Sequence, residues 1–335
     1  MNARFWYTFF SQSRRGFLNP NSVLNKLRNI PSKLPSHGNH CNIMQGPGTT
    51  GEAMYYPRSE YKSTRHYQGQ VKAVIFDWAG TVVDCGVLAP ALTFCELFKN
   101  EGVCITEEEA RGPMGAHKRV HIKKILENAS VQQRWIKVHG KAATEEDIDR
   151  MYKKFSPTVL SCLHKYSNII DGVVDTVKEL RRAHGIKIGS TTGFPKEILQ
   201  TLLRTSESQG YVPEANVAAD EVPEARPCPY MVWTCAMRLG VHPIEAIIKV
   251  DDTVDGIREG LSAGCWTIGV AKTSNYVGLT EQQLDDLSQL ELKQKLAHAY
   301  DILIDSGAHY VIDTVVELPL VIKDINRRLA GGEKP

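Results

Sequence analysis

Residues 71–81 read VKAVIFDWAGT, an apolar run that ends in an aspartate and a glycine-containing turn. The β-branched residues of this run predict a buried strand over residues 71–77. Similar runs predict four more strands, at 186–192, 246–252, 266–271 and 309–313. Because helical patterns separate these runs, we expect an α/β fold with a doubly wound parallel sheet. Ligands of such sheets bind beyond the carboxyl ends of the strands.

Residues 85–170 interrupt this alternation directly after the first strand. Their pattern is helical and contains no convincing strand, which favours a helical cap domain inserted into the core. We therefore expect the core to consist of residues 70–84 and 171–335. A Gly-Pro pair at 112–113 breaks the helical pattern inside the insertion.

Residues 1–69 differ in composition from the rest of the chain. The first acidic residue is Glu52, and six basic residues precede it, with serines and large apolar residues among them: Arg4, Arg14, Arg15, Lys26, Arg28 and Lys33. This composition is typical of a mitochondrial transit peptide. The alternative is a disordered N-terminal tail with no targeting function, on a cytoplasmic protein. We expect targeting, then a linker, and a globular protein that begins near Gln70.

The composition of all 335 residues excludes several classes of protein. Hydrophobic residues make up 42% and charged residues 23%, as in a globular protein. The net charge of +2 is too balanced for a dedicated nucleic-acid binder. No run approaches the roughly 20 apolar residues that span a bilayer. The eight cysteines contain no C-x-x-C pair, so we expect neither a zinc cluster nor a disulfide framework.

Polar side chains of complementary chemistry follow the predicted strands. Asp77 leaves its strand into a glycine-containing turn and is placed as an exposed nucleophile. The hydroxyl and backbone N–H groups of residues 190–193 (STTG) can hold a phosphoryl oxygen. Arg226, in a proline-stiffened segment, can bridge a carboxylate and a phosphoryl group. The pair Asp251-Asp252, with Asp255 nearby, predicts a Mg²⁺ site. Each motif alone is a common turn or helix start, but four in order favour a catalytic site.

The ordered set DWAGT, STTG, RP and DD resembles the haloacid dehalogenase superfamily of aspartyl-nucleophile phosphotransferases. Most phosphatases of that superfamily have a second aspartate two residues after the nucleophile, and here that position is Ala79. DWAGT, together with MGAHK at residues 114–118, is similar to the phosphonoacetaldehyde hydrolase (phosphonatase) branch. The resemblance covers the chain from Val71 to the C-terminal region. It implies a haloacid dehalogenase-like core and hydrolysis of a carbon–phosphorus bond, which yields acetaldehyde and phosphate.

The resemblance also implies roles for particular residues. Asp77 would attack phosphorus and form an aspartyl phosphate, while Lys118 would form a Schiff base with the aldehyde. The implied ligands of Mg²⁺ are Asp77, the Ala79 carbonyl and Asp252. Further implied contacts place Thr191 and Arg226 on the phosphoryl oxygens or beside the nucleophile, with Met114, Gly115 and Gly193 lining the substrate site. The partners implied are a small phosphonate and a second copy of the chain in a homodimer, with no nucleic acid or membrane.

The periodicity of the cap sequence gives Lys118 an independent interpretation. At about 100° per residue, Lys118 shares one helix face with His121, Ile122 and Ile125, and the neighbouring lysines do not. An ammonium group is disfavoured on an apolar face, so the pKa of Lys118 should fall, and a neutral amine can attack an aldehyde. The alternative is a lysine that extends along the cap edge into water. His121 either transfers protons during imine formation or is an ordinary packed histidine.

Some features leave alternatives open. In bacterial phosphonatases a glycine often precedes the ligand aspartate and a further aspartate follows four residues beyond it; here these positions are Asp251 and Gly256. Either Asp251 or Asp255 could supply the carboxylate outside the direct ligand set. Two other functions compete: a Mg²⁺-dependent phosphomonoester phosphatase or mutase, and a catalytically silent binding protein. The alanine at position 79 argues against the first, and the retention of all four motifs argues against the second.

Overall fold

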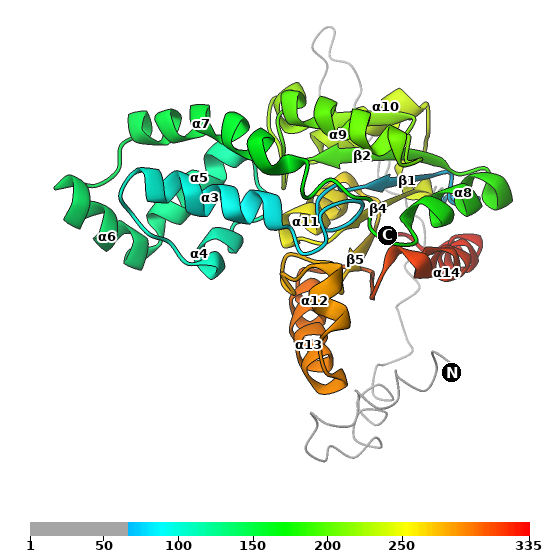
Figure 1. The fold of residues 1–335 in the computed structure, drawn as a ribbon. Helices are drawn as coiled ribbons and strands as arrows, with labels where there is room; N and C mark the ends of the chain where they lie inside the picture. Colours follow the sequence, from blue (N-terminus) through cyan, green and yellow to red (C-terminus); the bar gives the residue numbers. More distant parts are fainter. Residues whose placement is uncertain (1–65) are drawn as a thin grey trace, which may run out of the picture. The chain divides into compact units, whose positions relative to one another are not determined.

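A computed structural model describes residues 66–335, so most of the predicted targeting segment and linker lie outside the described residues. The described chain forms one parallel sheet in the order β3-β2-β1-β4-β5-β6 (Figure 1). Its strands are β1 (Ala73–Phe76), β2 (Lys187–Thr192), β3 (Ala215–Ala218), β4 (Ile247–Asp251), β5 (Trp266–Val270) and β6 (Tyr310–Ile312). This confirms the predicted α/β class, with β3 as an additional strand.

Helices cover both faces of this sheet. Successive side chains of β1 point to opposite faces: Ile75 packs in a cluster with α10 residues, and Val74 and Phe76 pack in the cluster that contains the buried face of α8. The helices of the core are α8 (Val173–His184), α9 (Lys196–Ser208), α10 (Tyr230–Leu239), α11 (Val254–Ala263), α12 (Glu281–Asp285), α13 (Gln289–Asp305) and α14 (Leu318–Ala330). Short 3₁₀ turns are η1 (Ala219–Glu221), η2 (Ile244–Ala246) and η3 (Val315–Glu317).

A group of helices follows β1 and precedes α8 in the sequence. In the structure these helices gather beside the carboxyl ends of the strands (Figure 1). Its members are α3 (Leu88–Asn100), α4 (Glu107–Arg111), α5 (Lys118–Glu127), α6 (Ala129–His139) and α7 (Glu145–Leu163). We call this group the cap. Phe94 of α3 and Phe155 of α7 pack with ring centroids 5.1 Å apart, and Ile122 of α5 is buried in the same cluster. The cap is thus held by its own apolar packing.

Within residues 66–335, no helix combines the length and apolar composition needed to cross a membrane. The cysteines of this part of the chain are all free thiols, and none is joined in a disulfide.

Candidate active site

The candidate site is a small cavity between the cap and the carboxyl ends of β1, β2 and β4. Its volume is about 20 Å³, which is room for about one water molecule. It is lined by core and cap residues together: Asp77, Ala79, Val87, Pro90, Met114, Gly115, Lys118, Thr192, Gly193, Phe194, Arg226 and Thr253. Most of the residues predicted from the sequence therefore meet here, and the cavity has no room for a molecule much larger than water.

Asp77 lies at the floor of this cavity, one residue after β1. Its backbone N–H donates to the Val250 carbonyl at 2.9 Å, and its Oδ1 accepts a hydrogen bond from Arg226 Nη2 at 2.6 Å. Burial raises the pKa of Asp77, although the Arg226 charge opposes this shift. Gly80 makes the following turn possible, because its φ is +88° and a Cβ there would lie 2.4 Å from Oδ2 of Asp252.

Three buried carboxylates form a cluster at the same sheet edge. Asp77, Asp251 and Asp252 each offer an oxygen within 4.8 Å of the others. Burial raises the pKa of Asp252 well above its usual range, and repulsion from the other two carboxylates adds to the shift. Such a cluster of hard oxygen donors fits a divalent cation such as Mg²⁺, which would remove the repulsion. Ala79 lines the adjoining cavity, which is compatible with the predicted carbonyl ligand.

Asp251, and not Asp255, belongs to this cluster. Asp251 is fully buried. Burial acts to raise its pKa, but the charges of Arg226 and Lys249 more than offset this effect, so the pKa is lowered. Asp255 instead faces the cap, where its Oδ2 lies 3.7 Å from Lys124 Nζ. Of the two aspartates that the sequence left open, Asp251 has the placement of a carboxylate beside the ligand set.

Two charged residues of the site were missed by sequence reasoning. Lys249 is fully buried within β4, with Nζ 2.7 Å from Asp251 Oδ2. Glu259 of α11 is also fully buried, with Oε2 2.9 Å from Arg226 Nε and 3.7 Å from Lys249 Nζ. A lysine inside the apolar run IIKV was the available signal, because a buried charge requires a partner.

Thr191 and Thr192 face different surroundings, as successive residues of a strand should. Thr191 accepts hydrogen bonds from Arg226 Nη2 on its carbonyl at 3.2 Å and on its hydroxyl at 3.1 Å. Its predicted role of orienting the nucleophile therefore fits, acting through Arg226. Thr192 and Gly193 line the cavity directly, whereas Thr191 is not among the lining residues. The expectation that the Thr191 hydroxyl holds a phosphoryl oxygen stays a prediction.

Lys118 is the first residue of α5 and points into the cavity. Only 4% of the residue is exposed, and Nζ lies 5.0 Å from the ring centroid of Phe194 and 6.0 Å from that of Phe94. Burial lowers the pKa of Lys118 to about 8, with Asp77 acting in the opposite direction. The predicted fall in pKa is confirmed, as is the face that Lys118 shares with Ile122 and Ile125, because all three are buried.

His121 lies on the same helix face but outside the cavity lining. Its ring stacks on Phe94 at a centroid distance of 3.8 Å, and its Nε2 lies 2.8 Å from the Ala110 carbonyl. Burial lowers the pKa of His121 well below the ordinary value. These contacts are those of a packed histidine, so the predicted role in proton transfer finds no support in its placement.

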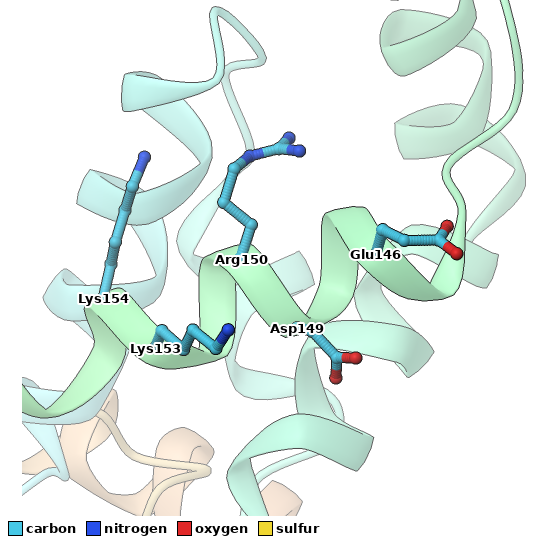
Figure 2. A pocket seen from close by; sticks show the side chains of 5 residues that line it. All are labelled: Glu146, Asp149, Arg150, Lys153 and Lys154. Atoms are coloured by element: carbon cyan, nitrogen blue, oxygen red, sulfur yellow. The ribbon is translucent and has the colours of Figure 1, made fainter.

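A larger hollow of about 440 Å³ lies on the surface of α7 (Figure 2). Its lining consists of charged side chains of both signs: Glu146, Asp149, Arg150, Lys153 and Lys154. Figure 2 shows these side chains leaving one helix in different directions. Arg150 and Lys154 are both paired with Glu101. We therefore regard this hollow as a solvated surface of the cap and the smaller cavity as the candidate active site.

Comparison with known proteins identifies the relatives of this chain. Residues 71–264 match the family model of haloacid dehalogenase-like hydrolases. A phosphonoacetaldehyde hydrolase of Bacillus cytotoxicus is 43% identical over 259 residues, which cover 77% of this chain and 98% of that protein. A phosphonoacetaldehyde hydrolase of Paraburkholderia phytofirmans is 44% identical over 265 residues, which cover 79% of this chain and 99% of that protein.

The solved structures give the same picture. A phosphonoacetaldehyde hydrolase-like protein from Oleispira antarctica has a TM-score of 0.80 at 43% identity, covering 82% of this chain and 100% of that one. A β-phosphoglucomutase from Clostridium difficile has a TM-score of 0.55 at 19% identity, covering 77% of this chain and 98% of that one, and shares the fold alone.

Proposed function

We propose that this chain, which belongs to the phosphonoacetaldehyde hydrolase family of the haloacid dehalogenase-like hydrolases, cleaves the carbon–phosphorus bond of phosphonoacetaldehyde. The products are acetaldehyde and phosphate. One observation carries the proposal: the buried amine of Lys118, with a pKa lowered to about 8, lines the same cavity as the Asp77 carboxylate. One group suits an aldehyde carbon and the other suits phosphorus, and phosphonoacetaldehyde contains both.

Lys118 makes the carbon a competent leaving group. Its neutral amine adds to the aldehyde, water is lost, and a protonated imine forms. When the carbon–phosphorus bond breaks, its electron pair moves toward the imine nitrogen and produces an enamine rather than a free carbanion. The enamine then takes a proton at carbon, and hydrolysis of the resulting imine releases acetaldehyde and regenerates the lysine.

Asp77 receives the phosphoryl group. Its carboxylate attacks phosphorus in line as the bond to carbon breaks, which gives an aspartyl phosphate that water later cleaves to phosphate. Arg226 holds Oδ1 of Asp77 at 2.6 Å and so fixes the direction of the attacking carboxylate. Thr192 and Gly193 line the cavity, and their backbone N–H groups would contact phosphoryl oxygens.

The buried carboxylate cluster supports a metal requirement. Asp77, Asp252 and the Ala79 carbonyl would hold Mg²⁺, which when bound neutralises charge on the phosphoryl oxygens. Arg226 and Lys249 neutralise part of the remaining negative charge, carried by Asp251 and its neighbours.

Ala79 argues against the competing phosphomonoester phosphatase or mutase. It lines the cavity at the position where most phosphatases of the superfamily carry a second aspartate that serves as general acid and base. An alkoxide leaving group needs a proton from such a group, whereas an enamine stores its electron pair on the imine nitrogen. The lack of a carboxylate at position 79 therefore fits cleavage of a carbon–phosphorus bond.

The test is covalent trapping. Borohydride added with phosphonoacetaldehyde should reduce the imine and leave an adduct on the peptide that contains Lys118, as seen by mass spectrometry. Lys118→Arg should give no adduct and release little phosphate. Lys124→Arg, at a half-exposed position six residues further along α5, is the matched control and should behave like wild type. Phosphate release near the wild-type rate by Lys118→Arg would refute the proposal.

We also propose a mitochondrial address for residues 1–69, supported by their basic, acid-free start. A fluorescent fusion of these residues should enter mitochondria, and a fusion with the six basic residues changed to glutamine should not. Diffuse cytoplasmic fluorescence of the unchanged fusion would contradict this address.

A homodimer is proposed from the family resemblance. Exposed apolar side chains on the cap helices, among them Leu92, Val120 and Ile136, offer a surface for the second copy. Light scattering coupled to gel filtration should give twice the mass of the chain, and a monomer mass would contradict this state.

A further inference from the structure

Asn275 lies in the segment that follows β5, where the core meets the cap. Only 2% of the residue is exposed. Its side-chain Nδ2 donates a hydrogen bond to the carbonyl of Arg111 at 3.1 Å, and Arg111 is the last residue of the cap helix α4. Its backbone N–H donates to Oδ2 of Asp252, just after β4, at 2.9 Å. One buried residue of the core therefore contacts both the cap and a carboxylate of the proposed metal site.

The side chain of Arg111 contacts Asn275 in return. Its Nη1 lies 3.3 Å from Oδ1 and 3.4 Å from the carbonyl oxygen of Asn275. The same nitrogen donates to the carbonyl of Gly86 at 2.6 Å, in the linker that leads from the core into α3. The Arg111 side chain is 12% exposed, so water competes little for these contacts. We call Arg111 and Asn275 together the clasp.

The clasp holds the start of the segment that leads to Lys118. The Arg111 carbonyl that accepts the hydrogen bond from Asn275 also accepts one from the N–H of Met114, at 3.0 Å. Residues 112–117 then continue to the first residue of α5, and Met114 and Gly115 line the cavity on the way. The contact with Asn275 thus fixes the position from which this part of the cap enters the proposed site.

The segment has little room to shift against the core. A Cβ atom at Gly115 would lie 2.5 Å from Oγ1 of Thr253, and one at Gly193 would lie 3.0 Å from the Gly115 carbonyl oxygen. Thr253 and Gly193 both belong to the core, so the backbone of the cap segment contacts the core closely on two sides. A small displacement at the start of the segment therefore changes the contacts along the cavity.

The core side of the clasp is also anchored beside the proposed nucleophile. The backbone N–H of Gly86 donates to the Thr273 carbonyl at 2.8 Å, and the Thr273 hydroxyl donates to the Gly80 carbonyl at 2.6 Å. Gly80 lies in the turn that follows β1. Together with the contact of Asn275 to Asp252, these hydrogen bonds join one short segment after β5 to the linker, to that turn and to the carboxylate cluster.

We propose that Asn275 is a positioning residue, which holds the segment leading to Lys118 in register with the carboxylates of the core. It acts through Arg111 on the cap side and through Asp252 on the core side. Asn275 is not among the residues that line the cavity, so this role needs no contact with the substrate. The inference rests on the proposed function, because it names the residue that holds the two reacting groups in place for one another.

The experiment uses two variants that each remove one half of the clasp. Asn275→Ala removes both side-chain contacts and keeps the backbone N–H that Asp252 accepts. Arg111→Met removes the guanidinium and keeps the carbonyl. The double variant tests whether the two residues act as a unit. Asn100→Ala, at an exposed asparagine of the cap helix α3, is the matched control and should behave like wild type.

Three quantities are measured for each protein. The first is kcat for phosphonoacetaldehyde with saturating Mg²⁺. The second is the yield of the borohydride adduct on Lys118. The third is the hydrogen exchange of residues 112–118 and of the cap helix α6, followed by mass spectrometry in EDTA without substrate. The third result does not depend on the reaction or on a bound metal.

We expect Asn275→Ala to lower kcat by roughly 10- to 100-fold, as for other residues that orient a reacting group from behind. The adduct on Lys118 should still form, because the lysine itself is unchanged. Exchange of residues 112–118 should become roughly 5- to 30-fold faster for the loss of a buried hydrogen bond, while α6 stays as in wild type. The double variant should lose no more kcat than Arg111→Met alone.

Four outcomes would overturn the inference. Equal acceleration of exchange in α6 would mean that Asn275 only stabilises the cap as a whole. Unchanged exchange of residues 112–118 would mean that the clasp does not hold this segment. Loss of the adduct together with kcat would place the effect on Lys118 itself. Losses that multiply in the double variant would show that the two residues act separately.

Two further results keep this test separate from the proposed function. Should Arg111→Met give no folded protein, Asn275→Ala still decides the role of Asn275 through exchange, adduct yield and kcat. A wild type that forms no adduct and releases no phosphate would defeat the proposed function. The exchange of residues 112–118 in EDTA would then still show whether Asn275 holds the cap segment.

Discussion

Replacing Lys118 with methionine should make the protein more stable while it abolishes activity. The pKa of Lys118 falls from the ordinary 10.5 to about 8 on folding because the side chain is buried. Each unit of this shift corresponds to about 1.36 kcal/mol, so at pH 7 the native state bears a cost of about 3 kcal/mol for keeping the protonated lysine there. Methionine has a similar length, carries no charge and suits a site flanked by Phe94 and Phe194.

Because Lys118 titrates, the difference in stability between Lys118→Met and the wild type depends on pH. Between pH 8 and 10.5 the unfolded state binds more protons at Lys118 than the native state does, so the wild type gains stability as pH rises through this window. The advantage of Lys118→Met should therefore be largest below pH 8 and narrow by about 2 kcal/mol between pH 7 and 9.5.

Urea unfolding at a series of pH values measures this difference. Lys118→Arg is the control, because arginine stays charged throughout the range and should show no gain at pH 7. It should then fall behind the wild type by about 2 kcal/mol between pH 7 and 9.5, because only the wild type gains stability there. If Lys118→Met is less stable than wild type at pH 7, or if the difference between the two does not change with pH, Lys118 is not held as a buried amine and the reasoning is wrong.

Three more predictions follow from the site. Asp77→Asn should stop phosphate release yet still allow borohydride to trap an adduct on Lys118, because imine formation does not use the carboxylate; the absence of any adduct by mass spectrometry would contradict this order of steps. Removal of divalent ions with EDTA should abolish phosphate release, and added Mg²⁺ should restore it in a colorimetric phosphate assay; full activity in EDTA would exclude a role for the buried carboxylate cluster in metal binding. His121→Phe should preserve the stack on Phe94 and retain most of kcat, whereas a role in proton transfer requires a loss of roughly 100-fold or more.

The core of the fold could be predicted because its strands are buried on both faces. β1 reads as a continuous apolar run and β4 as an apolar run interrupted only by Lys249. The aspartates that the structure brings together lie at or just after the ends of these strands. β3 was missed because its sequence, ANVA, holds one β-branched residue among alanines and an asparagine. It forms at the sheet edge through pairing with β2, which is a tertiary contact that local sequence does not encode.

The site was predictable where periodicity or strand position determines the outcome. The burial of Lys118 followed from its helix face, since position on a helix fixes which neighbours share the core. Lys249 and Glu259 could not be assigned in the same way, because their pairing joins a strand and a helix through Arg226, which comes from a third segment. His121 shows what periodicity cannot predict. Its helix face predicts that the side chain is buried, but not which group its ring nitrogen contacts. In the structure Nε2 contacts the Ala110 carbonyl and not the cavity.

The cavity joins two parts of the molecule that carry different halves of the chemistry. Lys118 belongs to a cap helix, whereas Asp77 belongs to the turn that leaves the central strand of the core. During the proposed reaction the substrate links Lys118 of the cap to Asp77 of the core. The carbon–phosphorus bond is part of this link, and it is the bond that breaks. After cleavage the two-carbon fragment stays with the cap and the phosphoryl group stays with the core. Reopening would then carry the fragments apart, so that recombination is prevented by distance.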